Sequence, residues 1–338
     1  MNRICVVFFY KIKVFFKNSV HYSLSFAFYD LLWWICFYVR TPFSYRLSSW
    51  ALGKKTAWLD GYIGKKYGDI IDKYKDNPPK ATSIDSYRIW VFWGQGEDAM
   101  PPLIKACYRQ LTEYNDNVIL VTNENVDDYL DIPVEIKEKV KSLKLTWANY
   151  SDIIRNLLLS NYGGLWIDST VWVSGELPMG LLLDSPLFTA CGKVLPTPRG
   201  IRFWTSYDWN WSSWCMGSNK SSYLLFAFVG EMLKEIAQRD KYWPDYVIQD
   251  YLILYACRSF PSVKADMSEA QKVEAKRRNE LATIMNDPYD ETVYQNLIKE
   301  DYVFKLSFRS AWREQTDDGR QTFYSRIVNG VIDNSTTR

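Results

Sequence analysis

The stretch SDIIRNLLLSNYGGLWIDSTVWV, which begins at Ser151, constrains the fold more than any other part of the chain. Its first half has apolar residues at helical spacing and predicts a helix over 151–161. Ser151 is expected to cap this helix, and Gly163-Gly164 to end it. The apolar run that follows predicts a buried strand over 165–168, with the carboxylate of Asp168 at its tip. Such a buried strand has little use for an acid unless something outside the sheet binds to it.

Two more buried strands are expected nearer the N-terminus, from the apolar runs YRIWVFW (87–93) and NVILVT (117–122). A helix pattern opened by two prolines lies between them. Strands that alternate with helices predict an α/β fold, with a mostly parallel sheet covered by helices. Ligands of such sheets bind outside the carboxyl ends of the strands. The predicted pocket is therefore lined by residues that follow these strand ends, namely Trp93, Gly94, Thr122, Asn123 and Asp168.

Asp152 and Arg155 are three residues apart and neighbours on one side of the predicted helix. One interpretation is an exposed ion pair, which contributes well under about 1 kcal/mol. The other is that Asp152 and Arg155 meet Asp168, because the helix leads directly into the strand that ends there. Arginine provides forked donors, and carboxylates accept from hydroxyl groups or bind a cation. The three side chains together predict a site for a polyhydroxylated, phosphorylated ligand.

The first forty residues differ from the rest, with many aromatic residues and several basic ones. A membrane-spanning helix over 18–39 is disfavoured by Asp30, because an acid at the bilayer centre costs about 2.5–3.5 kcal/mol. A helix lying in the membrane surface is favoured instead, and a helix packed on the main domain is the alternative. The apolar stripe of this helix is formed by Leu24, Phe28, Leu31, Ile35 and Val39. Pro78-Pro79 predicts a boundary between a helical leader and linker, residues 1–80, and a main domain, residues 81–330.

The composition excludes several classes of protein. The net charge of +2 lacks the concentrated basic charge with which a protein binds nucleic acid. His21 is the single histidine and the cysteines form no CxxC pair, which argues against a zinc site or a Cys–His nucleophile. Scattered cysteines in apolar contexts are typical of reduced core residues, and so of a cytosolic domain.

The segment FWTSYDWNWSSWC (203–215) is the densest aromatic stretch of the chain. Trp209 and Trp211 alternate as on one face of a strand, and Asp208 lies beside them. These rings either pack into the core or form a wall on which an acceptor sugar stacks. Further along, Asp250 follows YVIQ on a predicted helix, where it is a candidate base or hydroxyl acceptor.

The stretch SDIIRNLLLSNYGGLWIDSTV resembles the motif of the capsular polysaccharide synthesis family of bacterial glycosyltransferases. That family is related to a sugar-binding group with a DXD motif and to a group of mannosyltransferases. The segments RIWVFWGQGEDAMPPLIKAC, NVILVTNENVDDYLDIP and VFKLSFR resemble other parts of it, so the likeness covers roughly residues 87–310.

The resemblance implies a GT-A fold and transfer of a sugar from a nucleotide-diphosphate donor, with retention of the anomeric configuration. By position, it implies that Asp152 and Arg155 bind the donor sugar. Asp168 would meet the ribose or a metal ion, and Trp93 would border the base. Gly94 and Asn123 belong to the same donor-side loops.

This chain departs from a full DXD motif, because Thr170 replaces the second acid. Asp168 with the hydroxyl of Ser307 is the expected ligand set for Mn²⁺ or Mg²⁺, which also take phosphate and water oxygens. The alternative is that Lys305 and Arg309 supply positive charge to the leaving diphosphate in place of a metal.

Taken together, the sequence predicts a membrane-associated hexosyltransferase at the cytoplasmic face of the bacterial inner membrane. Its expected partners are a nucleotide-diphosphate sugar, a lipid-linked oligosaccharide that grows into a capsular or surface polysaccharide, and the membrane surface, but not nucleic acid. Two alternatives share the donor site: a protein-directed sugar transferase, and a catalytically silent sugar-binding scaffold at the membrane.

Overall fold

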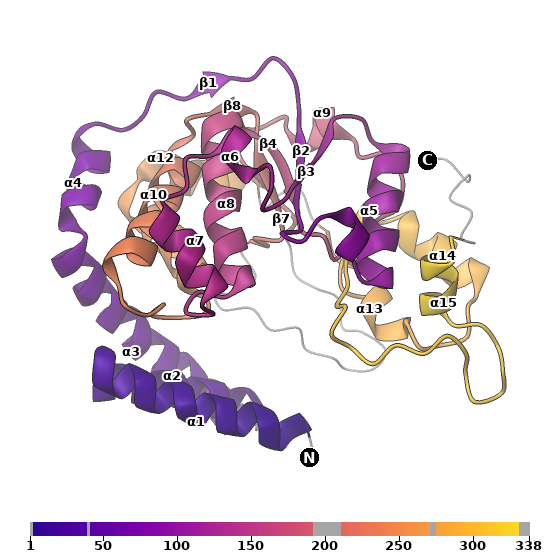
Figure 1. The fold of residues 1–338 in the computed structure, drawn as a ribbon, viewed down its shortest axis with the longest axis horizontal. Coiled ribbons are helices and arrows are strands. Elements are labelled where there is room, and N and C mark those ends of the chain that lie inside the picture. The colour runs from indigo at the N-terminus through magenta and orange to yellow at the C-terminus, as the bar shows by residue number, and fades with distance from the viewer. Residues whose placement is uncertain (1–2, 39–40, 192–210, 271–274, 331–338) are drawn as a thin grey trace.

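A computed structural model describes residues 3–38, 41–191, 211–270 and 275–330 of the chain (Figure 1). Its central sheet has five strands in the order β3-β2-β4-β7-β6. Their bounds are β2 (Ile89–Phe92), β3 (Val118–Val121), β4 (Gly164–Ile167), β6 (Phe188–Thr189) and β7 (Cys215–Ser218). The apolar runs of the sequence therefore form strands where they were expected: β2 and β3 are a residue or more shorter at their ends, and β4 begins and ends one residue earlier than predicted.

The sheet is mixed, so the prediction of a mostly parallel sheet is only partly correct. β2 runs parallel to both β3 and β4, whereas β7 runs antiparallel to β4 and to β6. A parallel connection needs a crossover, usually a helix. Among the described residues between β4 and β7, the only helix is the short α9 (Met179–Leu182).

Helices cover both faces of the sheet (Figure 1). Trp90 and Phe92 of β2 pack in the cluster that includes α8 (Trp147–Tyr162) and α10 (Leu224–Arg239). Ile89 and Val91 belong to the cluster on the other face, which includes Leu111 of α5 (Pro102–Tyr114). All four residues of β2 are buried, as expected for a strand with helices on both sides.

The helix α8 begins at Trp147, four residues before the predicted start, so the expected cap at Ser151 is wrong. Thr146 caps it instead, because its backbone is extended and its hydroxyl accepts from the amide of Asn149 at 3.2 Å. The predicted end at the two glycines is confirmed. Gly163 and Gly164 have φ of 64° and 88°, and a Cβ on Gly164 would lie 2.4 Å from the backbone oxygen of Arg88.

A separate two-stranded ribbon joins β5 (Val171–Val173) to β9 (Val303–Lys305) in antiparallel register, with Val171 opposite Lys305. A second ribbon pairs β1 (Thr82–Ser83) with β8 (Lys220–Ser221). The remaining elements between residues 97 and 328 are short helices around the sheet, namely η1 (Glu97–Ala99), α6 (Val126–Tyr129), α7 (Val134–Lys141), α11 (Ile248–Ser259), α12 (Pro261–Ala270), α13 (Leu281–Ile284), α14 (Glu291–Ile298) and α15 (Phe323–Val328).

The N-terminal part is helical, with α1 (Arg3–His21), α2 (Leu24–Tyr38), α3 (Pro42–Lys66) and α4 (Gly68–Asp76). In Figure 1, α1 and α2 lie together below the rest, and α3 leads up to α4. Leu59, Ile63 and Tyr67 of this part join the same buried cluster as α8 and α10. The leader therefore shares its core with the main domain, and the division at residue 80 stays a prediction.

Asp30, the residue that argued against a spanning helix, is buried and forms an ion pair with Lys55 at 2.6 Å. Lys55 is fully buried and forms a second ion pair with Asp245, also at 2.6 Å. On the predicted stripe of α2, Leu24 and Phe28 are 66% and 49% exposed. One face of α2 is thus packed and the other is open. Within the residues that the structure describes, no helix is both long and apolar enough to span a bilayer.

Candidate active site

A cavity of about 730 Å³ lies at the carboxyl ends of β2 and β4, where the strand-end rule predicts a ligand site. Six segments line it: the ends of β2 and β4, the first turns of α8, the residues before β7, the start of α11 and the segment after β9. Its walls are rich in rings, which include Phe92, Trp93, Trp147, Trp166, Trp211, Trp214, Tyr246 and Phe308.

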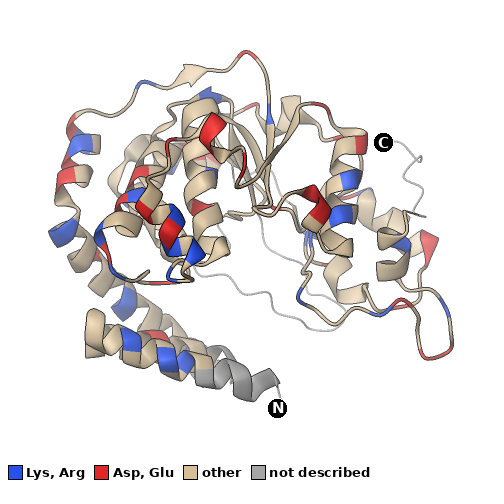
Figure 2. Ribbon diagram, viewed as in Figure 1, with Lys and Arg blue, Asp and Glu red and all other residues tan. Residues whose placement is uncertain are grey.

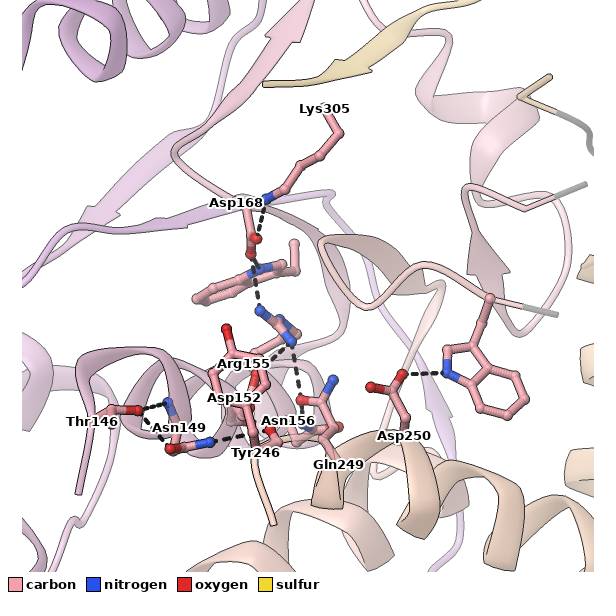
Figure 3. A network of polar contacts seen from close by, with 12 residues as sticks. Thr146, Asn149, Asp152, Arg155, Asn156, Asp168, Tyr246, Gln249, Asp250 and Lys305 are labelled. Atoms are coloured by element: carbon pink, nitrogen blue, oxygen red, sulfur yellow. Dashed lines mark hydrogen bonds and ion pairs between the residues drawn. The ribbon is translucent and has the colours of Figure 1, made fainter. Parts of the chain in front are cut away.

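Arg155 is the centre of the polar network beside this cavity (Figure 3). Its Nη1 donates to Asp152 at 2.9 Å and to Gln249 at 3.0 Å, and its Nη2 donates to Asp168 at 2.9 Å. The guanidinium lies 5.0 Å from the ring centre of Trp166 and is almost fully buried. Asp152, Arg155 and Asp168 therefore converge as predicted, and the alternative of an exposed ion pair is wrong.

Asp168 accepts from three donors. Its Oδ1 accepts from Arg155 and from the indole of Trp166 at 2.8 Å, and its Oδ2 accepts from Lys305 at 2.6 Å. Burial alone raises the pKa of this carboxyl, but the charges of Lys305 and Arg155 outweigh burial and lower the pKa to about 2. Asp168 is therefore an anion at every physiological pH.

Asp152 differs from Asp168 although both contact the same guanidinium. Burial raises the pKa of Asp152 to about 7, against the opposing charge of Arg155, and the nearby carboxylates of Asp250 and Asp168 raise it further. Two acids on one arginine thus have different proton affinities. Environments that separate the pKa values of neighbouring acids are common at functional sites.

Gln249 and Asn156 complete the network, and sequence reasoning missed both. The side-chain oxygen of Gln249 accepts from Arg155 and, at 2.8 Å, from Nδ2 of Asn156. Both residues are almost fully buried. The only local signal for Gln249 was a polar residue inside the apolar helix pattern YVIQDYLI, and Asn156 stands in the same way inside IIRNLLL. Such polar residues are more often turned to solvent.

Asp250, the predicted base, lines the cavity and accepts at 2.8 Å from the indole of Trp211, a predicted acceptor residue. This contact joins two residues that were predicted separately. Trp209 and Asp208, the other predicted acceptor residues, lie outside the described residues.

Of the three loop residues predicted to bind the donor, two line the cavity and one does not. Trp93 and Gly94 line the cavity, and Trp93 packs edge-to-face on Phe308 with ring centres 5.7 Å apart. The indole nitrogen of Trp93 is buried and has no hydrogen-bond partner among the described residues. Asn123 is not part of the lining; it lies behind Gly94, whose oxygen accepts from its amide at 3.0 Å. A Cβ on Gly94 would lie 2.8 Å from the ring of Trp147, so the glycine lets this ring approach the strand end.

The residues present do not fit a resident Mn²⁺ or Mg²⁺. Both oxygens of Asp168 accept from cationic groups, and Thr170 accepts from Lys305 at 2.6 Å. Ser307 lines the cavity, and its backbone oxygen accepts from the indole of Trp312 at 2.7 Å. Over the described ranges, no three His, Cys, Asp or Glu side chains gather closely enough for a metal ion. The side-chain oxygens that a metal ion would need at Asp168 and Thr170 are thus already occupied by cationic donors.

The sequence profile of the capsular polysaccharide synthesis proteins matches residues 43–327, which is most of the chain and includes every described residue of the cavity. The chain belongs to the capsular polysaccharide synthesis protein family. No curated protein matches it. The match begins inside α3, so the capsular polysaccharide synthesis unit includes the second half of the helical leader as well as the sheet. Membership of this family indicates a role in capsule biosynthesis.

The arrangement suits a ligand that carries both negative charge and hydroxyl groups. Lys305 and Arg309 supply positive charge on one wall, and Asp152 and Asp250 present carboxyl groups on others. Aromatic rings provide flat apolar faces between them. The network of Arg155 holds Asp152 and, through Asp168, Lys305 in place before any ligand arrives.

Proposed function

We propose that this capsular polysaccharide synthesis protein is a GT-A-type glycosyltransferase that moves a hexose from a nucleotide-diphosphate sugar to a lipid-linked acceptor. The observation that carries the proposal is the bridge by Arg155 between Asp152 and Asp168, at the mouth of a cavity with cations on one wall and indoles on the others. A sugar nucleotide offers matching chemistry, with a diphosphate, many hydroxyl groups and a flat base.

The transfer breaks the bond between the anomeric carbon and the diphosphate oxygen, and both electrons of that bond stay on the diphosphate. The acceptor hydroxyl oxygen forms the new bond to the anomeric carbon on the face that the diphosphate leaves, as retention requires, and its proton passes to Asp250. Lys305 and Arg309 stabilise the negative charge that develops on the departing diphosphate. Asp152 and the guanidinium of Arg155 orient the sugar, and the family resemblance favours retention of configuration.

The acceptor side is proposed to face a membrane. Leu24, Phe28 and Phe43 are exposed on the N-terminal helices, whose charged residues are mainly basic (Figure 2). Exposed apolar side chains beside Lys and Arg favour binding to an anionic lipid surface. We therefore propose that the protein lies peripherally at the cytoplasmic face of the bacterial inner membrane, where a lipid-linked acceptor would be within reach.

Release of nucleoside diphosphate tests the proposal directly. The purified chain is incubated with UDP- and GDP-hexoses and a lipid-linked acceptor, and free UDP or GDP is measured with time. Turnover should fall by at least about a hundredfold in Asp168→Asn, because the charge that fixes Arg155 and Lys305 is lost. Asp266→Asn, which changes an acid of α12 that does not line the cavity, is the matched control. Binding of a nucleotide sugar without any turnover would support the silent scaffold instead.

A further inference from the structure

The ammonium of Lys305 occupies the place where a two-acid motif would bind a cation. It donates to Asp168 Oδ2 and to Thr170 Oγ1, both at 2.6 Å, and these residues are the first and third of the sequence Asp-Ser-Thr. The position follows from the ribbon, since β9 pairs with β5 and sets Lys305 opposite Val171. A fixed cation is therefore built into the fold at this point.

A divalent ion would have to compete with this ammonium for its ligands. One oxygen of Asp168 already accepts from Arg155 and Trp166, and the other accepts from Lys305. Thr170 gives only a neutral hydroxyl, which is a weaker ligand than the carboxylate it replaces. An ion that displaced Lys305 would leave a lysine without its partner beside a doubly charged metal, and that arrangement is repulsive.

Two cations face the cavity with donors to spare. An ammonium has three N–H groups, and Lys305 uses two of them while its side chain stays 26% exposed. Arg309 lines the same cavity four residues later and is exposed. In the described part of the chain, its guanidinium forms no hydrogen bond or ion pair and lies 5.5 Å from the ring centre of Phe308. Forked donors on a free guanidinium suit phosphate oxygens.

We infer that the diphosphate of the donor is bound by Lys305 and Arg309 without a divalent cation. This inference rests on the proposed function, since it concerns the donor of that transfer. The ammonium of Lys305 is held by the side-chain oxygens of Asp168 and Thr170, and the exposed guanidinium of Arg309 contacts the diphosphate from the solvent side of the cavity. Together they supply the two positive charges that a metal ion would bring.

Calorimetric titration of the full chain with UDP and with GDP tests the inference. Each nucleotide is titrated once in EDTA and once with MnCl₂. We expect the Kd in EDTA to equal the Kd with Mn²⁺ within about twofold for the nucleotide that binds. Lys305→Met and Arg309→Met should each weaken binding in EDTA by roughly 10- to 100-fold, because each removes a charge-assisted hydrogen bond.

Two controls separate loss of binding from loss of fold. Lys299→Met removes an exposed lysine at the end of α14, and its Kd should not change. Thermal unfolding of each variant shows whether the chain is folded. Arg309 has no ion pair to lose in the described structure, so Arg309→Met keeps the test valid even if Lys305→Met unfolds.

The outcomes distinguish this inference from the proposed function. Binding only in the presence of Mn²⁺ overturns the metal-free diphosphate site and leaves the glycosyltransferase standing. Binding in EDTA that survives both methionine substitutions also overturns it. If neither UDP nor GDP binds in either buffer, the donor class itself is wrong and the proposed function fails with it.

Discussion

Replacing Lys55 with methionine should destabilise the protein severely, although Lys55 lies far along the chain from the cavity residues. Its side chain is fully buried, and its Nζ is 2.6 Å from Asp30 Oδ1 and 2.6 Å from Asp245 Oδ2. The two carboxylates are themselves only 9% and 5% exposed. Lys55→Met leaves both of them without the cation between them.

The expected cost is about 3–5 kcal/mol, the range found when one partner of a buried ion pair is removed. Methionine fills most of the lysine volume, so little of this cost comes from a cavity. For a chain of this length, we expect the melting temperature to fall by roughly 10 °C. Lys54→Met is the matched control, because Lys54 is the exposed neighbour on the same helix, and it should change the melting temperature by no more than about 1 °C.

The acid dependence of the loss identifies its cause. Burial opposes ionisation of Asp30, but Lys55 outweighs burial and lowers the pKa of Asp30. In the wild type this carboxyl therefore stabilises the fold above its unfolded pKa of 3.8, and the contribution disappears as pH falls through the lower folded value. The deficit of Lys55→Met should be full near neutral pH and shrink in acid, where Asp30 is protonated in both proteins.

Thermal and urea unfolding of wild type, Lys55→Met, Lys54→Met and the double variant Lys55→Met/Asp30→Asn measures these values. The double variant should recover part of the loss, since one stranded carboxylate is neutralised. A deficit below about 1 kcal/mol at neutral pH would refute the reasoning, because it would mean that the two acids are solvated and the N-terminal helices are not locked to the loop at Asp245.

Three further outcomes are expected. Gly164→Ala should cost about 3 kcal/mol or more by urea unfolding, because its φ of 88° and the 2.4 Å approach of backbone forbid a Cβ, whereas Gly61→Ala has open space and should be neutral or stabilising. Burial raises the pKa of Asp152 to about 7, so between about pH 4 and pH 7 the folded chain holds a proton that the unfolded chain has lost. The wild-type free energy of unfolding should therefore fall as pH rises through this range, and Asp152→Asn should lack that fall in urea titrations at stepped pH. In flotation with anionic liposomes, Leu24→Ser/Phe28→Ser should bind at least about tenfold more weakly, whereas Val134→Ser, also at an exposed apolar residue, should bind as the wild type does.

Local patterns were enough to predict the centre of the site. Asp152, Arg155 and Asp168 are consecutive parts of one helix–turn–strand unit, so their convergence depends only on the two glycines that turn the chain. The strands β2, β3 and β4 were predictable for the same reason, since strands of a helix-covered parallel sheet are continuous apolar runs. The start of α8 was not, because Thr146 and Ser151 are both good caps and only backbone conformation decides between them.

Contacts between distant parts of the chain were beyond local patterns. Lys305 reaches Asp168 because β5 pairs with β9, and no periodicity in the sequence predicts that ribbon. Gln249 joins the network because the first turn of α11 lies beside Arg155 and Asn156 of α8, and that placement depends on packing. The sequence indicated that Asp30 disfavours a membrane-spanning helix, but its partner Lys55 lies in another helix, and only the fold brings the two together.

The indole of Trp166 supports the guanidinium of Arg155 on its face and donates to Asp168 from its edge, while the ring of Trp214 lies 5.8 Å from the ammonium of Lys305. Tryptophan emission depends on nearby charge and on access to water. Occupancy of the cavity should therefore be visible in the native fluorescence of the chain, without a label, and substitution of either ring by phenylalanine would show which wall the signal comes from.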